Sequence, residues 1–378
     1  MVNRFFSLWL FITGIFLCAS VGAWFFFLKS SSHDNPDNVV HIYNWAEYLP
    51  RDVLDEFEKE TGITVLYDSF DGIEALETKI FTNPGYDLVF PPAWPLFVRC
   101  VEANILLPLN YEWIPNASLL DPWILEKLKR ANPGGAYGVP YLWGTTGFGI
   151  NHSAVFLEES DVESWGIFFH PETAKKLESA NLFLLDSALD VFQAAMLYLG
   201  HSPITEDIHL WDKAIRLVYR IRPYIQRFTG ARQKENLLEH ASFIHQGFST
   251  YITMAALQNV KGQKDKIRYY IPKEGAMVWF DMMAIPKGAR HVRNAHRLIN
   301  FILQPRIIAQ ISNCVCAANP VPSSKPWIKE ELLNMHTIFL TPEMYKRLHE
   351  DFVPSAKLLK YLSRAWLKIK MGIPPVEK

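Results

Sequence analysis

Apolar runs and amphipathic segments alternate along most of the chain after Val39. Residues 39–43 form a short run rich in apolar side chains, which is typical of a buried strand. From Pro50 to Thr61 the apolar residues recur at helical spacing, and Gly62 follows where a glycine commonly ends a helix. The same patterns predict further strands at residues 63–67, 86–90, 183–185, 267–271 and 278–285, and helices at residues 73–81, 95–103, 188–199 and 208–221.

Strands separated by helices predict a mostly parallel sheet that is covered on both faces. Residues 139–151 form an apolar segment rich in Gly and Thr that is long for one strand, and such a segment can run from one domain into another. Beyond Pro286 the pattern is mainly helical to about Lys370. Two α/β lobes joined by crossing strands would have a cleft at the carboxyl ends of their strands.

The first 38 residues have a different composition from the rest. An uncharged run of 24 residues, from Phe5 to Leu28, precedes Lys29 and a polar stretch that ends at Asn38. This arrangement is typical of an export signal, and the run is longer than the roughly 7–15 apolar residues of a cleaved signal. We therefore expect an uncleaved anchor in the inner membrane, with the rest of the chain in the periplasm. Cleavage after Ala23, which would release a soluble periplasmic protein, stays open as the alternative.

The composition fits a globular protein and argues against a nucleic-acid partner. Hydrophobic residues make up 49% and charged residues 20% of the 378 residues, and the formal net charge is -1. A phosphate-binding surface needs a clear excess of Lys and Arg, which this chain lacks. Aromatic residues make up 14%, with 12 Trp. Most of these side chains should lie in the core, and a few could line a ligand site.

No motif in the chain indicates catalysis or a bound cofactor. We find no Gly-x-Ser-x-Gly elbow, phosphate-binding Walker loop or His-Glu-x-x-His motif. Cys314 and Cys316 have no His or acid at metal-ligand spacing, so we expect a buried pair of thiols and no metal site. The protein is therefore not expected to be an enzyme.

Six segments in the expected order resemble the spermidine/putrescine-binding proteins of polyamine ABC transporters. The resemblance extends from about Val39 to Lys370, and Gly275-Ala276-Met277 and Ile311-Ser312-Asn313 are more similar to the putrescine-preferring branch. The segments are residues 42–48, 57–63, 86–89, 139–147, 271–277 and 300–305.

The resemblance implies a fold and a partner. The fold is a two-lobed α/β periplasmic-binding-protein fold with crossing hinge strands and a ligand cleft between the lobes. Residues 39–147 plus 280–325 would form lobe 1, and residues 148–279 plus 326–378 would form lobe 2, after a signal or anchor and linker at residues 1–38. The implied partners are a polyamine and the permease of an ABC transporter, and the protein is expected to be a monomer. A polyamine sensor that acts on a membrane signalling protein is the alternative function.

The resemblance also implies a ligand site built from aromatic residues and acids. Aromatic faces pack on the methylenes of a polyamine and attract its cations, and carboxylates pair with its ammonium groups. Trp279 and Asp281 lie two residues apart and so on one face of a strand, where an unpaired buried Asp would be costly. The implied site residues are Trp45, Glu47, Tyr48, Trp94, Asp190, Phe248, Tyr251, Trp279 and Asp281.

Three of these assignments have a structural alternative. Trp45 could cap a strand in the core, Trp94 could pack in the core, and Asp190 could be a solvated residue near a helix N-terminus, where an acid is favoured.

Several positions depart from the family pattern. A ligand-contacting Ser becomes Pro92 and another becomes Gly230, a Trp becomes Phe248, an aromatic residue becomes Ala317, and a carboxylate becomes Tyr251. A neutral phenol cannot balance an ammonium group at pH 7. We therefore expect weaker binding of putrescine than of a longer polyamine or a monocationic amine.

Overall fold

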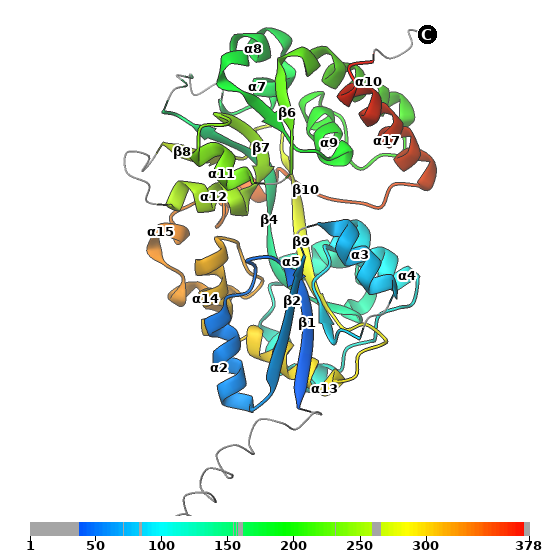
Figure 1. The fold of residues 1–378 in the computed structure, drawn as a ribbon, viewed down its shortest axis with the longest axis vertical. Helices are drawn as coiled ribbons and strands as arrows, with labels where there is room; N and C mark the ends of the chain where they lie inside the picture. The colour runs from blue at the N-terminus through cyan, green and yellow to red at the C-terminus, as the bar shows by residue number, and fades with distance from the viewer. Residues whose placement is uncertain are drawn as a thin grey trace, which may run out of the picture.

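The computed structural model describes residues 38–70, 72–82, 85–153, 155, 157, 162–230, 232–258 and 266–373. The expected export segment, Phe5 to Leu28, lies outside these residues. The described residues form one long sheet of ten strands with the order β2-β1-β3-β9-β4-β7-β5-β6, in which β10 pairs with β9 and β8 pairs with β4. Helices cover the sheet in two groups, one at each end of the long axis (Figure 1).

The lower group in Figure 1 is built on the N-terminal strands. Strand β1 (Val39–Trp45) pairs in parallel with β2 (Thr64–Phe70) and with β3 (Leu88–Val89). Helix α2 (Arg51–Thr61) connects β1 to β2 and buries Val53, Leu54 and Phe57, the face that its sequence pattern predicts. Gly62 ends this helix with φ 70°, a left-handed conformation that a residue without Cβ adopts without strain.

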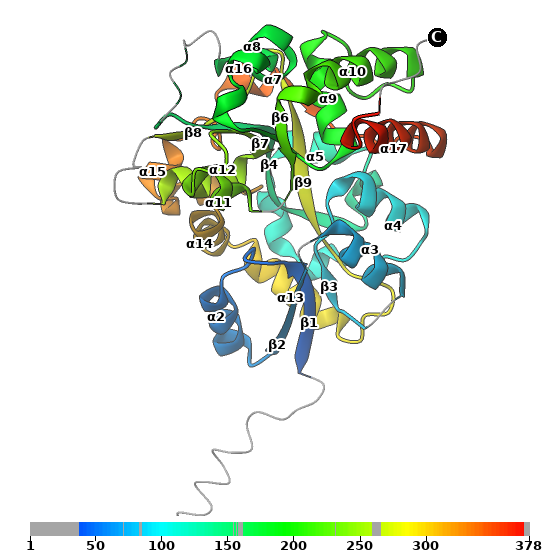
Figure 2. The same cartoon turned by 45° about the horizontal axis from the view of Figure 1, so that its top comes forward.

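Two long strands connect the two groups. Strand β4 (Gly138–Asn151) is buried along its whole length, and it pairs antiparallel with β9 (Ala276–Ala284). Beyond Thr146, β4 pairs with β7 (Ile244–Phe248) and β8 (Ile267–Tyr270) of the upper group. Both strands run from the lower to the upper helices, and β9 keeps this course in the turned view of Figure 2.

The upper group surrounds β5 (Leu182–Leu184) and β6 (Ile225–Phe228). Helix α10 (Ile208–Ile221) packs against α9 (Ala188–Tyr198) and against α17 (Ala356–Lys370). Their buried side chains, among them those of Phe192, Trp211 and Trp366, form one hydrophobic cluster. A second cluster fills the lower group, and a third lies along the crossing strands between them.

The remaining elements complete the two groups. Among the described residues they are a π-helical turn at Ala93–Phe97, the helices α3 (Ile73–Thr82), α4 (Val98–Glu102), α5 (Pro122–Leu128), α7 (Gly166–Phe169), α8 (Pro171–Lys176), α11 (Gln233–Leu238), α12 (Ser249–Leu257), α13 (Val292–Ile302), α14 (Pro305–Val315), α15 (Glu330–Leu333) and α16 (Pro342–Tyr345), and the strand β10 (Leu348–Glu350).

The structure confirms the predicted α/β fold and corrects some local expectations. The C-terminal part contains one strand, β10, within the segment predicted to be mainly helical. Strands β6 and β7 were not predicted. Cys316 is buried but Cys314 is exposed, so the expectation of a buried thiol pair is wrong, because Cys314 lies on the outer side of α14. Within the described ranges, no helix has the length and apolarity to cross a membrane.

Candidate functional site

Asp281 is a carboxylic acid inside the apolar strand β9. It is 6% exposed, and its neighbours Phe280 and Met282 are fully buried. The strand contacts the lower group at this point, because Met282 donates its backbone N–H to the carbonyl oxygen of Pro91 at 2.9 Å. Alternation along a strand puts Trp279 on the same face as Asp281, about 6.6 Å away along the strand. An acid and an indole therefore project together from the centre of the molecule.

Asp281 receives side-chain hydrogen bonds from Trp45, the last residue of β1, and from Tyr48 in the loop after it. The indole N–H of Trp45 also donates to the carbonyl oxygen of Phe90 at 3.1 Å. Burial raises the pKa of Asp281 to about 7, and these two hydrogen bonds oppose the shift. Asp281 makes no ion pair with any Lys, Arg or His that the structure describes. Its charge therefore has hydrogen-bond donors around it but no cation.

The loop after β1 is shaped by local hydrogen bonds. The side-chain oxygen of Asn44 accepts from the backbone N–H of Trp45 at 2.8 Å, and Glu47 has a positive φ of 56°. This turn buries Tyr48, which is 6% exposed, and leaves Glu47 exposed. Burial is the main reason that the pKa of Tyr48 is well above its usual value, and the charge of Asp281 adds to it. Tyr48 is thus a neutral hydrogen-bond donor to that carboxylate.

The indole of Trp279 packs closely over Gly144 of the neighbouring strand, where no side chain is in its way. It lies opposite Gly144 of β4, where an added Cβ would be 2.4 Å from Cζ2 of the indole and 2.5 Å from Oγ of Ser249. Any side chain at Gly144 would displace the indole. The ring centroids of Trp279 and Phe248 are 6.3 Å apart, with the planes at 86°. The indole N–H of Trp279 is buried and has no hydrogen-bond partner among the described residues.

Tyr251, in the first turn of α12, lies close to this group. The charge of an ionised Tyr251 and the charge of Asp281 would each raise the pKa of Tyr48. Such an effect requires short distances, so the two phenols lie near one another and near Asp281. The N-terminus of α12 is fixed to β4, because Oγ of Ser249 accepts from the backbone N–H of Thr145 at 3.2 Å. A phenol is neutral at pH 7, so Tyr251 adds polarity to the group but no charge.

Asp190 lies in the first turn of α9. Oγ of Ser187 caps the helix by accepting from the backbone N–H of Asp190 at 3.3 Å. Helix α9 packs against β9, which brings this helix terminus to the crossing strands. Burial raises the pKa of Asp190, and a hydrogen bond from Ser187 opposes the shift.

Asp351 is a second acid beside Asp190, and the sequence analysis did not select it. Strand β10 pairs in parallel with β9, with Glu350 opposite Val278, so the next residue follows the strand at the level of Trp279. Oδ1 of Asp351 accepts from Nε2 of Gln193 at 2.8 Å and from the backbone N–H of Phe352 at 2.8 Å. Burial raises the pKa of Asp351 to about 6, and the nearby charge of Asp190 adds to the rise.

The predicted site residues therefore occupy three positions. We call the region where β4 and β9 connect the two groups the waist. At its lower side lie Trp45, Tyr48, Tyr251 and Asp281, and Trp279 and Phe248 adjoin them. Asp190, with Asp351, lies at the upper side. Trp94 is 8% exposed and packs in the central cluster, with its ring centroid 6.5 Å from that of Phe280, which points away from the face of Asp281.

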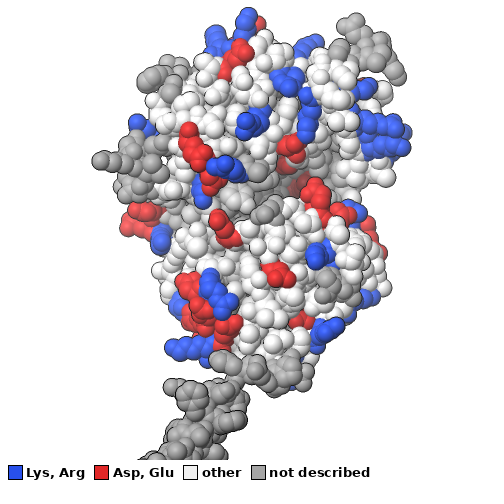
Figure 3. Space-filling model, in the orientation of Figure 1, with Lys and Arg blue, Asp and Glu red and all other residues white. Residues whose placement is uncertain are grey.

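The acidic character of the waist is visible on the surface. On the face drawn in Figure 3 the molecule is hollowed between its two halves, and Asp and Glu side chains lie along the edge of the hollow. The described residues contain no group of His, Cys, Asp and Glu side chains arranged to hold a metal ion. The arrangement of acids and aromatic faces suits an organic cation.

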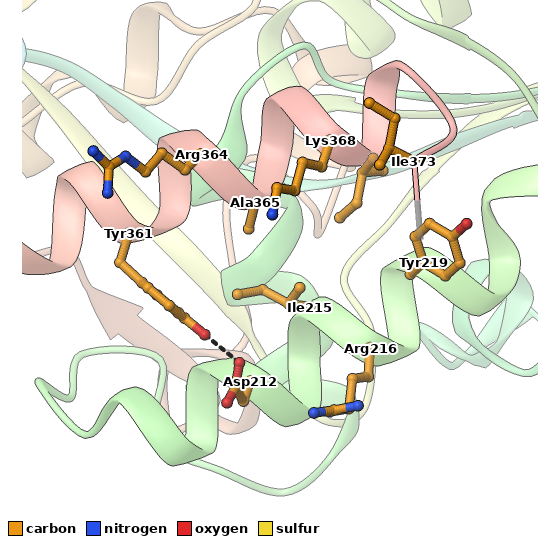
Figure 4. A pocket seen from close by; sticks show the side chains of 10 residues that line it. Asp212, Ile215, Arg216, Tyr219, Tyr361, Arg364, Ala365, Lys368 and Ile373 are labelled. Carbon is orange, nitrogen blue, oxygen red and sulfur yellow. Dashed lines mark hydrogen bonds between the residues drawn. The ribbon is translucent and has the colours of Figure 1, made fainter. Parts of the chain in front are cut away.

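A second hollow lies outside the waist, between α10 and α17 (Figure 4). Its volume is about 380 Å³, and Arg216, Arg364 and Lys368 are among its lining residues. The carboxylate of Asp212, which also lines it, accepts a hydrogen bond from the hydroxyl of Tyr361. Three cationic side chains against one acid in this lining disfavour an amine as its ligand.

The chain is similar to known proteins over most of its length. The family model described as bacterial extracellular solute-binding protein matches residues 52–330. The chain is 34% identical to the putrescine-binding periplasmic protein SpuD of Pseudomonas aeruginosa over 341 residues, which cover 89% of this chain and 93% of that protein. It is 32% identical to the putrescine-binding periplasmic protein PotF of Escherichia coli, over 88% of this chain and 91% of that protein.

A solved structure gives the same relation. The spermidine/putrescine ABC transporter substrate-binding protein PotD of Streptococcus pneumoniae superposes with a TM-score of 0.77 and is 28% identical. The superposition covers 89% of this chain and 99% of that one.

Proposed function

The chain belongs to the bacterial extracellular solute-binding protein family, and we propose that it binds a polyamine of the putrescine or spermidine type and delivers it to an ABC transporter. Its relatives are periplasmic binding proteins for putrescine and spermidine. Each of them is named as a binding protein, which supports a binding role without catalysis for this chain. The site at the waist supplies the chemistry that such a ligand requires.

One observation carries the proposal. Asp281, Asp190 and Asp351 are partly or fully buried, and none of them forms an ion pair within the described part of the chain. Burial raises the pKa of each, so the free protein bears the cost of desolvating acids without a cation to compensate. A ligand that carries ammonium groups would compensate these charges, because charge-assisted hydrogen bonds are the strong kind.

The aromatic side chains fit the rest of such a ligand. Trp45 and Tyr48 hydrogen bond to Asp281, and the rings of Trp279 and Phe248 contact each other nearby along β9. Their faces can pack against methylene groups and attract an ammonium group through the ring quadrupole, for roughly 0.5–2 kcal/mol each. Ser and Thr hydroxyls alone would favour a polar ligand such as a sugar, whereas this lining favours an apolar chain with charged ends.

The two groups of acids define two poles. Asp281 with its two aromatic donors is one pole, and Asp190 with Asp351 is the other, with Trp279 between them. We therefore propose a ligand with at least two cationic groups, one at each pole. Because Tyr251 is neutral beside the first pole, a short diamine such as putrescine should bind less tightly than a longer polyamine.

The same proposal fixes the organisation of the chain. We place lobe 1 at residues 39–147 plus 280–325 and lobe 2 at residues 148–279 plus 326–378, so that β4 and β9 are the crossing hinge strands. The protein would act as a monomer in the periplasm, held at the inner membrane by residues 1–38. The burial of β4 from end to end supports its role as a hinge strand that both lobes enclose.

A thermal-shift panel tests the proposal. The purified chain is melted with diamines, triamines, amino acids and divalent metal ions. A polyamine at 100 times its dissociation constant should add roughly 2.7 kcal/mol to the free energy of unfolding, and Asp281→Asn should reduce this gain to about a third or less at the same ligand concentration. A melting shift with another ligand class, and none with any polyamine at millimolar concentration, would contradict the proposal.

A further inference from the structure

The outer faces of α10 and α17 carry basic side chains without acidic partners. Residues 356–373 contain five Lys or Arg and no Asp or Glu. One of the five, Lys370, pairs with Asp186 at 2.7 Å. The unpaired basic residues, all exposed and without an ion pair among the described residues, are Lys213, Arg216, Arg220, Lys357, Lys360, Arg364 and Lys368.

This accumulation of charge is local. The chain as a whole has a formal net charge of -1, whereas residues 356–373 carry five basic residues and no acidic one. Figure 3 shows Lys and Arg side chains gathered there, over the position of α17 in Figure 1. An excess of unpaired cations of this kind attracts an anionic surface or an acidic molecule.

Exposed apolar side chains lie among these cations. Leu367 is 57% exposed and Met371 56%, and Leu359 and Ile373 are 40% and 45% exposed. Helical spacing puts Lys360, Leu367 and Met371 on one stripe, together with Arg364 and Lys368. The opposite face of α17, with Leu362 and Trp366, is buried against the upper group.

The hollow between α10 and α17 continues this surface inward. Ile215, Ala365 and Ile369 line it together with cationic side chains, and in Figure 4 side chains of both helices face the space. Asp212 is engaged by the hydroxyl of Tyr361. The surface thus offers cations around an apolar interior, which is the arrangement that a charged head group attached to a hydrocarbon chain requires.

We propose that the α10–α17 surface binds the face of a lipid bilayer that contains anionic phospholipids. Basic side chains approach the phosphate groups, and Leu367 and Met371 enter the boundary between head groups and acyl chains. A bilayer satisfies both features at once, whereas an acidic peptide would pair with the cations and leave these apolar side chains in water. That is the reason for choosing a membrane over a protein partner.

The position of the surface has a consequence for orientation. Strand β1 begins at the end of the long axis opposite the upper group, which carries α17 (Figure 1). A tether that precedes Val39, together with contact at α17, would lay the long axis along the membrane. The waist would then stay close to the bilayer, where a transporter would receive the ligand.

Hydrogen–deuterium exchange of the full chain in lipid nanodiscs tests the proposal. Exchange at residues 356–373 should slow in discs with phosphatidylglycerol compared with discs of phosphatidylcholine alone, and high salt should remove the difference. In the variant Lys360→Gln/Arg364→Gln/Lys368→Gln, the slowing of exchange at residues 356–373 in anionic discs should be lost, since each basic residue near such a surface contributes several-fold to the local contact.

A matched variant, Lys175→Gln/Lys176→Gln/Lys325→Gln, removes the same charge from exposed positions elsewhere and should behave as the parent. Polyamine-induced melting shifts should be equal in all three proteins, which separates this proposal from the proposed function and checks folding. Equal exchange in both kinds of disc, an effect shared by the control variant, or protection that appears only with a partner protein would each overturn the membrane assignment.

Discussion

Replacing Asp281 by Asn should weaken ligand binding and, at the same time, stabilise the free protein at alkaline pH. The substitution keeps the shape of the side chain and removes its charge. In the proposed complex this charge would pair with an ammonium group, and loss of one partner from a buried ion pair costs about 2–5 kcal/mol. Because 1.4 kcal/mol corresponds to a factor of ten, the dissociation constant should rise from about 30-fold to several thousand-fold.

The opposite effect on stability follows from the raised pKa. The pKa of Asp281 is about 7 in the folded chain, against an ordinary value of 3.8 for an exposed Asp. The stability associated with the protonated acid is complete below pH 3.8 and is lost as pH rises through 7. A difference of about 3 pKa units corresponds to about 4 kcal/mol at pH 8. Asp281→Asn avoids this loss of stability at pH 8. The net gain is smaller by the stability that the hydrogen bonds from Tyr48 and Trp45 to the carboxylate contribute.

Two measurements and one control test whether Asp281→Asn weakens binding and stabilises the free protein. Calorimetry gives the affinity for a polyamine, and chemical denaturation without ligand gives the free energy of unfolding at pH 5 and pH 8. The control is Asp87→Asn, since Asp87 is fully buried and accepts hydrogen bonds from the backbone N–H groups of His41, Arg290 and His291 at 2.8–2.9 Å. That variant should lose stability and keep its affinity.

Affinity and stability measured together distinguish a carboxylate that binds the ligand from one that serves only the fold. A carboxylate that serves only the fold would lose stability when it becomes an amide, as Asp87 should. Unchanged affinity in Asp281→Asn would remove Asp281 from the site. Reduced affinity together with reduced stability at pH 8 would refute the idea that Asp281 is strained in the free protein and compensated by the ligand.

Four further outcomes can be checked with the same assays. Polyamine affinity should fall roughly 30-fold between pH 8 and pH 5.5, because the ligand needs Asp281 ionised and its pKa is about 7; a flat profile would contradict this. Gly144→Ala should weaken binding at least tenfold, seen by calorimetry, because the new Cβ displaces Trp279; unchanged affinity would exclude Trp279 from the site. Tyr251→Asp should raise diamine affinity more than triamine affinity, and Asp351→Asn should lower both; equal diamine and triamine changes in the first variant, or none in the second, would contradict these assignments.

Much of the fold could be predicted because its segments have clear local patterns. The helix predicted at residues 208–221 has the same limits in the structure, and the segment predicted to cross between lobes is the strand β4. The strand β7 was missed because Ile244–Phe248 contains His, Gln and Gly, which a buried central strand tolerates only with specific partners. Its Gln246 side chain accepts from the backbone N–H of Leu185 at 3.3 Å, a contact that sequence spacing does not reveal.

The site was predictable where two residues share one strand, and less so where tertiary contacts assemble it. Trp279 and Asp281 could be paired from their spacing alone. Asp351 could not, because it acquires its position from the parallel pairing of β10 with β9 and from the packing of α9, elements separated by more than 60 residues. Asp351 directly follows the short strand β10, and no local sequence pattern there marks it as a site residue.

The distribution of charge explains how the same chain can fold stably and still respond to a cationic ligand. Asp87 shows that this fold can bury a carboxylate with several donors, two of which come from the turn before α13. At the waist the fold instead gives Asp281 two aromatic donors and gives Asp190 a second acid as its neighbour. Repulsion between Asp190 and Asp351 and the desolvation of Asp281 both weaken the free state, and a cation that touches both poles would relieve both at once. Closure of the two lobes would then be driven by charges that the protein leaves uncompensated, so the carboxylates would set the affinity and the spacing between the poles would set the length of the preferred amine.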